Sequence, residues 1–343
     1  MMVVPLDHAG GELLAEAQIP SYDYFAGLLN KANNCEGNVP SGHARRTLYA
    51  QVGAEKLSDL MTLRKVGVEM LASEPCRTLL TGIAGIPGGR HALNAFSGPY
   101  GWYATFEEGW RAARRANLVG HEDPGEIEVH LRHSESLRPS DYAALYWISN
   151  IHPRNPRIFD FGGNVGNVYY SYSPRLLNLG NIEWTVFDIP LMLENGRRIA
   201  AERKAASLRF VDSPGAFESD RILLVSGAFH YWEKDIPAFL QLFNNPPKHI
   251  LINRSPVHET QPSFISAQQT ESCAFPCKVW NSDELISSFA AGGYKLIDRW
   301  RALELSLKLP LFPKLSVPFY SGFYFSMEKS AQSFPLPAVA NER

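Results

Sequence analysis

The sequence RIFDFGGNVGNVYYSY, residues 157–172, decides the fold class. A short apolar run ends at Phe161, three glycines follow within five positions, and an aromatic-rich segment of helical length comes next. Glycine between a strand and a helix lets a ligand approach the main chain and the N-terminus of the helix. The stretch therefore predicts a strand, a ligand-binding turn and a helix of an α/β domain.

The chain beyond this turn alternates between short apolar runs and helix-like stretches, which is typical of a mostly parallel sheet wound with helices. The seven predicted strands are RIFDF (157–161), WTVFDI (184–189), LRFVD (208–212), RILLVSG (221–227), HILINR (249–254), YKLIDRW (294–300) and FYSGFYFSM (319–327). Three prolines in residues 302–318 leave no room for a crossover helix before the last run. We therefore expect the seventh strand to run antiparallel to the others.

The chain is expected to divide into three parts. Residues 1–149 form a mostly helical N-terminal region, which includes the aromatic segment AFSGPYGWYATFEEGW (95–110). Residues 150–330 form the ligand-binding α/β domain, and residues 331–343 form a flexible tail. The helical expectation rests on the periodic apolar residues of segments such as 105–120.

Composition excludes several classes of function. The 343-residue chain has a formal net charge of −2, so it lacks the basic excess that binding to a phosphate backbone needs. No window reaches the ~18 uncharged apolar residues of a membrane span, and the N-terminus lacks the pattern of a signal peptide. We expect a cytoplasmic protein with a small-molecule partner, no nucleic acid and no membrane span, and the sequence leaves a homodimer open.

Cysteine usage agrees with a reducing compartment. Four cysteines, Cys35, Cys76, Cys273 and Cys277, are too few for a disulfide framework in a chain of this length. The spacing of Cys273 and Cys277 would suit two metal thiolates, but no second Cys or His pair lies nearby. We expect reduced thiols and no metal site.

Two ligand classes use a glycine turn of this kind. Dinucleotides favour G-x-G-x-x-G with an acid about 20 residues downstream, but asparagines take the second and third glycine positions here, and Asp188 lies further away. S-adenosylmethionine favours E/D-x-G-x-G-x-G, which Asp160, Gly162 and Gly166 match, with Asn164 in place of the middle glycine. Asparagine tolerates a positive φ better than most residues. S-adenosylmethionine is the predicted cofactor, and a nicotinamide dinucleotide is the alternative.

The ends of the predicted strands supply the other cofactor contacts. Asp188 ends the second strand and can accept hydrogen bonds from both ribose hydroxyls, and Ser226 and Gly227 end the fourth strand, where open α/β sheets bind ligands. The complete predicted cofactor set is Asp160, Gly162, Gly163, Asn164, Gly166, Asp188, Ile189, Asp212, Ser213, Ser226 and Gly227.

Several motifs together carry a resemblance to a known family. They are FSGPYGWYATFEEGW, FDFGGNVG, SDRILLVSGAFHYW, LINRSPVHE, the FISAQ segment and GGYKLIDRW, within residues 96–325. The chain resembles a bacterial family of class I S-adenosylmethionine-dependent methyltransferases that is often met among genes for surface polysaccharide (O-antigen-type) biosynthesis. The resemblance implies the seven-stranded, Rossmann-like sheet of that class and the cofactor. It also implies that Asp212 lies near the adenine amino group, and it leaves the acceptor open.

Three side chains are candidate catalytic bases: His230, His258 and Glu107. His230 follows Gly227 in the strand-end loop, and imidazole titrates near neutral pH. The alternative is that both histidines only shape their loops and that Glu107 belongs to a solvated first turn of a helix. In-line methyl transfer also gains much of its rate from positioning, so a general base is not required.

Candidate acceptor-binding residues follow from the chemistry of a ring that bears hydroxyls. Arg254 can bind an anionic group in two-pronged fashion, or it can form a salt bridge at the sheet. Aromatic side chains can stack on a sugar as a lid, or they can join the helical region to the sheet. The predicted acceptor set is Tyr100, Trp102, Tyr103, His230, Tyr231, Arg254 and Gln268.

These residues favour a methyltransferase for a small polar acceptor, first of all O-methylation of a sugar or a related metabolite. Two alternatives stay open. One is a methyltransferase-like scaffold without catalysis, since a fold does not establish a reaction. The other is an NAD-dependent oxidoreductase.

Overall fold

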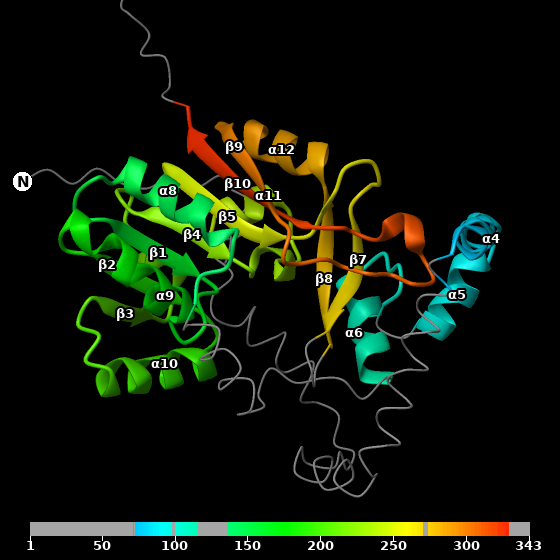
Figure 1. Ribbon diagram of the computed structural model, residues 1–343, viewed down its shortest axis with the longest axis horizontal. Coiled ribbons are helices and arrows are strands. Elements are labelled where there is room, and N and C mark those ends of the chain that lie inside the picture. Colours follow the sequence, from blue (N-terminus) through cyan, green and yellow to red (C-terminus); the bar gives the residue numbers. More distant parts are fainter. Residues whose placement is uncertain (1–70, 72, 98–99, 116–135, 270–273, 329–343) are drawn as a thin grey trace, which may run out of the picture.

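The central element of the structure is a seven-stranded sheet (Figure 1). This computed structural model describes residues 71, 73–97, 100–115, 136–269 and 274–328. The sheet has the order β3-β2-β1-β4-β5-β10-β9. Its strands are β1 (Arg157–Phe161), β2 (Glu183–Phe187), β3 (Leu208–Val211), β4 (Ile222–Ser226), β5 (His249–Ser255), β9 (Tyr294–Ala302) and β10 (Tyr320–Met327). Strands β1 to β5 pair in parallel, and β10 is antiparallel to both of its neighbours. The predicted sheet and its antiparallel last strand are confirmed.

Both faces of this sheet are covered by helices, which explains why its strands read as apolar runs. The covering helices are α8 (Asp141–Ile151), α9 (Asn167–Leu176) and α10 (Pro190–Glu202) on one face, and α11 (Ile236–Leu240) and α12 (Ser282–Ala291) on the other. Neighbouring residues of β1 point to opposite faces, so Ile158 packs in the α8–α9 core and Phe159 packs in the α11–α12 core. Both side chains are completely buried.

A second, three-stranded sheet was not predicted from the sequence. It has the order β6-β8-β7 and consists of β6 (Val257–His258), β7 (Phe264–Gln269) and β8 (Ala274–Asn281). Strand β6 begins two residues after β5 ends, so the small sheet lies next to the carboxyl ends of the parallel strands (Figure 1). Cys277 is buried on β8, whereas Cys273 lies outside the described residues.

The N-terminal helices pack around the small sheet. They are α4 (Glu74–Gly85), α5 (Gly89–Ser97) and α6 (Phe106–Arg115). Helix α6 contacts β7 and β8, where a Cβ on Gly109 would lie 3.0 Å from Pro276. The backbone of Tyr103 exchanges two hydrogen bonds with Ile265 of β7, at 2.8 and 3.1 Å. These helices therefore extend the molecule beyond the small sheet (Figure 1).

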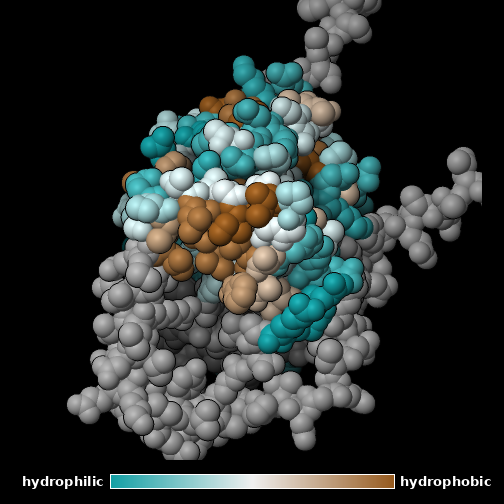
Figure 2. All heavy atoms as spheres, turned by 90° about the vertical axis from the view of Figure 1, so that its right-hand side faces the viewer, coloured by the Kyte–Doolittle hydropathy of each residue, from teal (hydrophilic) through white to brown (hydrophobic). Residues whose placement is uncertain are grey.

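In the described part of the chain, 3-10 helices lie in the connections: η1 (Leu177–Leu179), η2 (Pro214–Ala216), η3 (Phe229–Tyr231) and η4 (Pro313–Leu315). Figure 2 shows apolar side chains gathered at the end of the molecule where α4 and α5 lie. The exposed large apolar residues here are Leu79 of α4, Ile86 in the turn after α4, and Phe96 of α5. None of the helices in the described ranges is long and apolar enough to cross a membrane. The predicted tail, residues 331–343, lies outside those ranges.

Candidate functional site

The turn between β1 and α9 has a left-handed backbone at three positions. The φ angles are 71° at Gly162, 55° at Asn164 and 86° at Gly166, which is the N-cap of α9. Asn164, in place of the middle glycine of the motif, takes a left-handed conformation that asparagine tolerates better than most residues. Such angles are costly for most side chains, so the residue types of this turn follow from its backbone.

Packing within the protein supplies a second reason for the glycines. A Cβ on Gly162 would overlap the Cβ of Ala228 in the loop after β4. A Cβ on Gly163 would lie 2.6 Å from the carboxyl group of Asp160, and one on Gly166 would lie 2.8 Å from Leu208. The glycines thus let the turn pack against β1, β3 and the β4 loop, a cause that the sequence alone did not reveal.

Asp188 holds the turn against the end of β2. Its Oδ2 accepts a hydrogen bond from the Asn164 N–H and its Oδ1 accepts one from the Ile189 N–H, both at 2.7 Å. Burial raises the pKa of this half-buried carboxyl to about 6, against the two backbone donors that lower it. Each carboxylate oxygen has a further lone pair, so Asp188 can also accept hydrogen bonds from a ligand.

Asp160 lies beneath the turn and is completely buried. Its Oδ2 accepts a hydrogen bond from Trp184 Nε1 at 3.1 Å, while its Oδ1 is buried without a partner among the described residues. Burial, with a smaller contribution from the nearby Asp188, raises the pKa of Asp160 to about 7. A buried carboxylate oxygen without a donor is costly, so this position suits a cationic ligand group.

Asp212 and Ser213 follow β3 on the exposed side of the site. Arg197 of α10 donates a hydrogen bond to Asp212 Oδ1 at 2.7 Å, and the Asp212 side chain is 70% exposed. Ser213 Oγ accepts a hydrogen bond from the Gly215 N–H at 3.1 Å and caps η2. The contact of Asp212 with an adenine stays a prediction.

Arg254 takes part in a buried polar network that the sequence did not reveal. Its Nη1 donates to Asp141 Oδ1 at 2.7 Å, and its Nη2 donates to Ser226 Oγ at 2.8 Å. Asp141 Oδ1 also accepts hydrogen bonds from the Tyr172 hydroxyl at 2.8 Å and from Asn253 Nδ2 at 3.1 Å. These contacts give Arg254 the structural role that was its alternative, and they engage Ser226 within the protein.

Three residues of the predicted acceptor set, His230, Tyr231 and Gln268, lie together. His230 Nε2 lies 2.9 Å from Gln268 Oε1, which also accepts a hydrogen bond from the Tyr231 hydroxyl at 3.1 Å. Because this amide oxygen accepts, we assign the imidazole proton to Nε2. Burial lowers the pKa of His230 to about 4, so the ring is neutral at pH 7. This environment favours a positioning role for His230 over that of a general base.

The other two candidate bases have structural contacts. His258 Nε2 bonds to the Lys314 carbonyl oxygen at 2.9 Å, and its Nδ1 accepts from the N–H groups of Thr260 and Gln261. Glu107 is exposed and pairs with Arg111 at 3.3 Å, one turn further along α6. These contacts account for both side chains without catalysis, and their roles as bases stay predictions.

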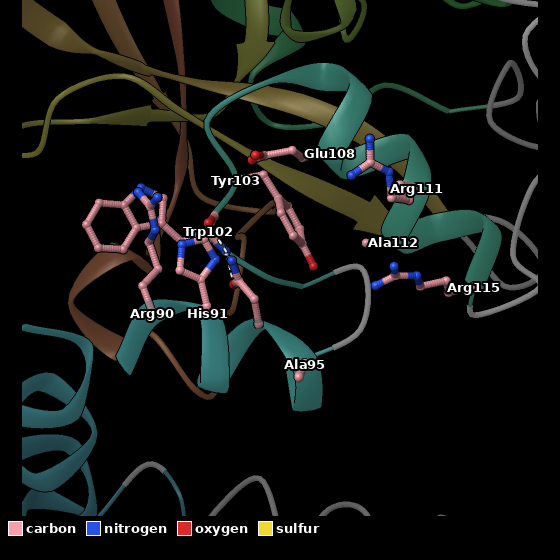
Figure 3. Close-up of a pocket in the computed structure, with 10 residues that line it drawn as sticks. Arg90, His91, Ala95, Trp102, Tyr103, Glu108, Arg111, Ala112 and Arg115 are labelled. Atoms are coloured by element: carbon pink, nitrogen blue, oxygen red, sulfur yellow. Dashed lines mark hydrogen bonds between the residues drawn. The ribbon is translucent and has the colours of Figure 1, made fainter. Parts of the chain in front are cut away.

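The aromatic segment does not lie over the glycine turn in the arrangement that the structure describes. Tyr100 and Trp102 pack in the apolar cluster around Leu309 and Phe312, and Tyr103 packs with Ile265 of β7. The segment therefore joins the N-terminal helices to the small sheet, which was the alternative to a lid. Trp102 and Tyr103 line a separate pocket between α5 and α6 (Figure 3).

Comparisons with known proteins give distant structural likenesses alone. No family model and no curated protein matches the sequence. Among solved structures, the chain is similar to the Burkholderia thailandensis 1,6-didemethyltoxoflavin-N1-methyltransferase, with 16% identity, a TM-score of 0.40 and coverage of 66% of this chain and 92% of that chain. The glycopeptide N-methyltransferase MtfA gives 13% identity, a TM-score of 0.39 and coverage of 56% and 96%. The mitomycin 7-O-methyltransferase MmcR gives 14% identity, a TM-score of 0.39 and coverage of 61% of this chain and 59% of that chain.

The fold class is defined by the strand order of the large sheet. These distant likenesses assign no activity to this chain. Strands β3-β2-β1-β4-β5 run in parallel, and the antiparallel β10 lies between β5 and β9. The seven-stranded sheet with its antiparallel last strand is the one that the sequence resemblance to class I methyltransferases implies. Gly162, Asp188 and Gly227 lie at the carboxyl ends of β1, β2 and β4, which is the edge where open α/β sheets generally bind ligands.

Proposed function

We propose that this protein is an S-adenosylmethionine-dependent methyltransferase that acts on a small polar acceptor. The observation that carries the proposal is the Asp188 carboxylate, which is fixed by two 2.7 Å backbone hydrogen bonds at the end of β2 beside a left-handed glycine turn. A carboxylate so fixed keeps its remaining lone pairs in place for a pair of ligand hydroxyls.

The residues of the turn fit the charge pattern of this cofactor. Asp188 would accept the ribose hydroxyls, and Asp160, whose Oδ1 lacks a partner in the described part of the chain, would favour the ammonium group of the methionine portion. Asp212 would lie at the adenine end, beside Arg197. The bound cofactor supplies a methyl group that is activated by its positively charged sulfur.

Gln268 is the residue we assign to acceptor contact. It is half-buried, and its amide oxygen is held by His230 and Tyr231, which leaves the amide NH₂ without a protein partner among the described residues. That group can donate hydrogen bonds to an acceptor oxygen, and His230 positions it. Orientation of this kind can supply much of the acceleration of an in-line transfer.

A sugar hydroxyl is the first candidate acceptor, and the product is then an O-methyl sugar for a surface glycan. The support is the resemblance of the sequence motifs and the amide donor of Gln268. The test is an assay with S-adenosylmethionine labelled on its methyl group against a metabolite extract and purified nucleotide sugars. Label on a protein or a nucleic acid, or on no acceptor at all, would overturn the small-acceptor proposal.

Calorimetry separates the main proposal from its alternatives. The native chain is titrated with S-adenosylmethionine, S-adenosylhomocysteine and NADH, and binding of the first two alone is expected. Binding of NADH alone would favour an oxidoreductase, and no binding at millimolar concentration would favour a scaffold.

The His230→Ala variant is expected to keep cofactor affinity and to lose turnover through weaker acceptor binding, whereas unchanged turnover would remove His230 from the mechanism.

A further inference from the structure

A pocket of about 400 Å³ lies between α5 and α6 (Figure 3). Figure 1 shows both helices on the side of the small sheet that faces away from β1. Its walls come from α5, from α6 and from the segment that holds Trp102 and Tyr103. The proposed function does not use this pocket.

The charged groups that line the pocket are mostly cationic. Arg90 comes from α5, and Arg111 and Arg115 come from α6, four residues apart and hence on one side of the helix. The carboxylate in the lining is Glu108, whose Oε2 accepts the Ala104 N–H at 2.9 Å. The lining thus contains three guanidinium groups and one carboxylate. It is locally cationic in a chain whose formal net charge is −2.

An ion pair between one of these arginines and an acid outside the lining neutralises little of this charge. Glu107 pairs with Arg111 at 3.3 Å, but the two side chains are 71% and 55% exposed. Exposed pairs of this type contribute little and give way readily to a better partner. His91 adds an imidazole to the same lining.

The floor of the pocket is fixed by hydrogen bonds. Asn94 Oδ1 accepts the Trp102 N–H at 2.9 Å, and Asn94 Nδ2 donates to the Trp102 carbonyl oxygen at 2.8 Å. The Arg90 guanidinium lies over the Trp102 ring, 5.2 Å from its centre. In Figure 3 the Tyr103 hydroxyl and the Arg115 guanidinium extend toward the same space. Burial raises the pKa of Tyr103, against a hydrogen bond with Ser97 that lowers it, so its hydroxyl stays protonated at neutral pH.

We propose that this pocket binds a phosphate ester, with the phosphate between Arg111 and Arg115 and the rest of the ligand against Trp102 and Tyr103. Guanidinium groups match phosphate oxygens in a two-pronged geometry, and a phosphate monoester carries between one and two negative charges at neutral pH. Aromatic side chains beside the arginines suit a ring attached to that phosphate. The site is separate from the proposed methyl-transfer site and does not depend on it.

The test is calorimetry on the full-length protein with uridine diphosphate, inorganic pyrophosphate, malonate and uridine as probes. Uridine diphosphate is expected to bind, with an affinity that falls at high salt. Pyrophosphate is expected to bind more weakly than uridine diphosphate, and malonate and uridine at least tenfold more weakly. Equal binding of malonate would overturn the phosphate assignment, and binding of no phosphate compound at millimolar concentration would overturn the site.

Variants locate the site. Arg115→Gln is expected to weaken uridine diphosphate binding at least tenfold, whereas Arg114→Gln, on the same helix but outside the lining, leaves it unchanged. Saturating S-adenosylhomocysteine and the Asp188→Asn variant are also expected to leave it unchanged. Equal losses in the two arginine variants, or competition by S-adenosylhomocysteine, would place the nucleotide elsewhere. Thermal unfolding of each variant checks that a loss of binding is not a loss of folding.

Discussion

Replacement of Asp188 is the sharpest test of the cofactor assignment. The carboxylate accepts hydrogen bonds from Asn164 and Ile189, each at 2.7 Å, and is expected to accept two more from ribose hydroxyls. Hydrogen bonds to a charged group contribute about 1.5–3 kcal/mol each, with part of that recovered from water. We expect Asp188→Ala to weaken S-adenosylmethionine binding by about 1–3 kcal/mol, which is a factor of roughly 5 to 150 in Kd.

Asp188→Asn separates the contact from the shape of the site. Asparagine keeps the volume and one acceptor oxygen, but its NH₂ group faces one of the two backbone N–H groups that the carboxylate now binds. We expect a loss of about 1 kcal/mol in cofactor binding, with a thermal midpoint nearer to that of the native protein than Asp188→Ala shows.

Titration calorimetry measures both variants, with Asp283→Asn as the control. Asp283 lies in the exposed first turn of α12, outside the glycine turn and the strand ends that form the site. Cofactor affinity within twofold of native in a folded Asp188→Ala protein would refute the reasoning, because it would mean that the ribose does not contact this carboxylate. An equal loss in Asp283→Asn would assign the effect to general destabilisation.

The remaining predictions concern protonation and packing. Since burial raises the pKa of Asp160 to about 7 and of Asp188 to about 6, cofactor affinity measured by calorimetry should rise from pH 5 to pH 8 as both carboxyls ionise, and an affinity that falls would contradict their contact with a cation. Between about pH 4 and pH 7 these two carboxyls keep their protons in the native state but lose them in the unfolded state. Their contribution to the free energy of unfolding therefore falls as pH rises through this range. Asp160→Asn should flatten this pH dependence, measured by urea unfolding. Arg254→Met leaves the buried Asp141 carboxylate without its ion-pair partner and should lower the free energy of unfolding by about 3–5 kcal/mol, with part of the loss recovered when Asp141→Asn is added. Gly162→Ala combines a φ of 71° with overlap at Ala228 and should lower the thermal midpoint, and Ala228→Gly in the same chain should restore the steric part but not the backbone strain.

The main sheet was predictable because its inner strands, such as β1, β4 and β5, are buried on both faces. Strands such as β4 and β5 then appear in the sequence as continuous apolar runs, which need no knowledge of their partners. The antiparallel β10 followed from the prolines before it, since no crossover helix can form there.

The small sheet was missed because its strands depend on pairing more than on composition. Strand β7 contains Ser266 and two glutamines, and β8 contains Pro276, which is unusual in a strand. Pro276 is tolerated because it pairs with Ala267 alone, at a position where β6 does not extend alongside β8. Strand propensity reflects such neighbours, and the sequence does not display them.

The candidate site divides in the same way. The sequence showed the asparagine at the middle glycine position, Asn164, and the acid that follows β2, Asp188. Both belong to local motifs, and they lie 24 residues apart in the chain. The partner of Arg254 was not, because Asp141 lies 113 residues earlier in the chain. The pocket lined by Arg90, Arg111 and Arg115, here called the arginine pocket, has one feature that the sequence shows. Arg111 and Arg115 are four residues apart in a helix, which places both on one side.

Strand β7 connects the two sites that we propose. Gln268, near its end, accepts hydrogen bonds from His230 and Tyr231 at the strand-end loop of the large sheet. Ile265, three residues earlier, exchanges two backbone hydrogen bonds with Tyr103, which lines the arginine pocket. A strand rises about 3.3 Å per residue, so the two contact points are about 10 Å apart along one extended backbone. The small sheet therefore belongs to the architecture of both sites, because the same six-residue strand fixes the amide of one and the aromatic wall of the other.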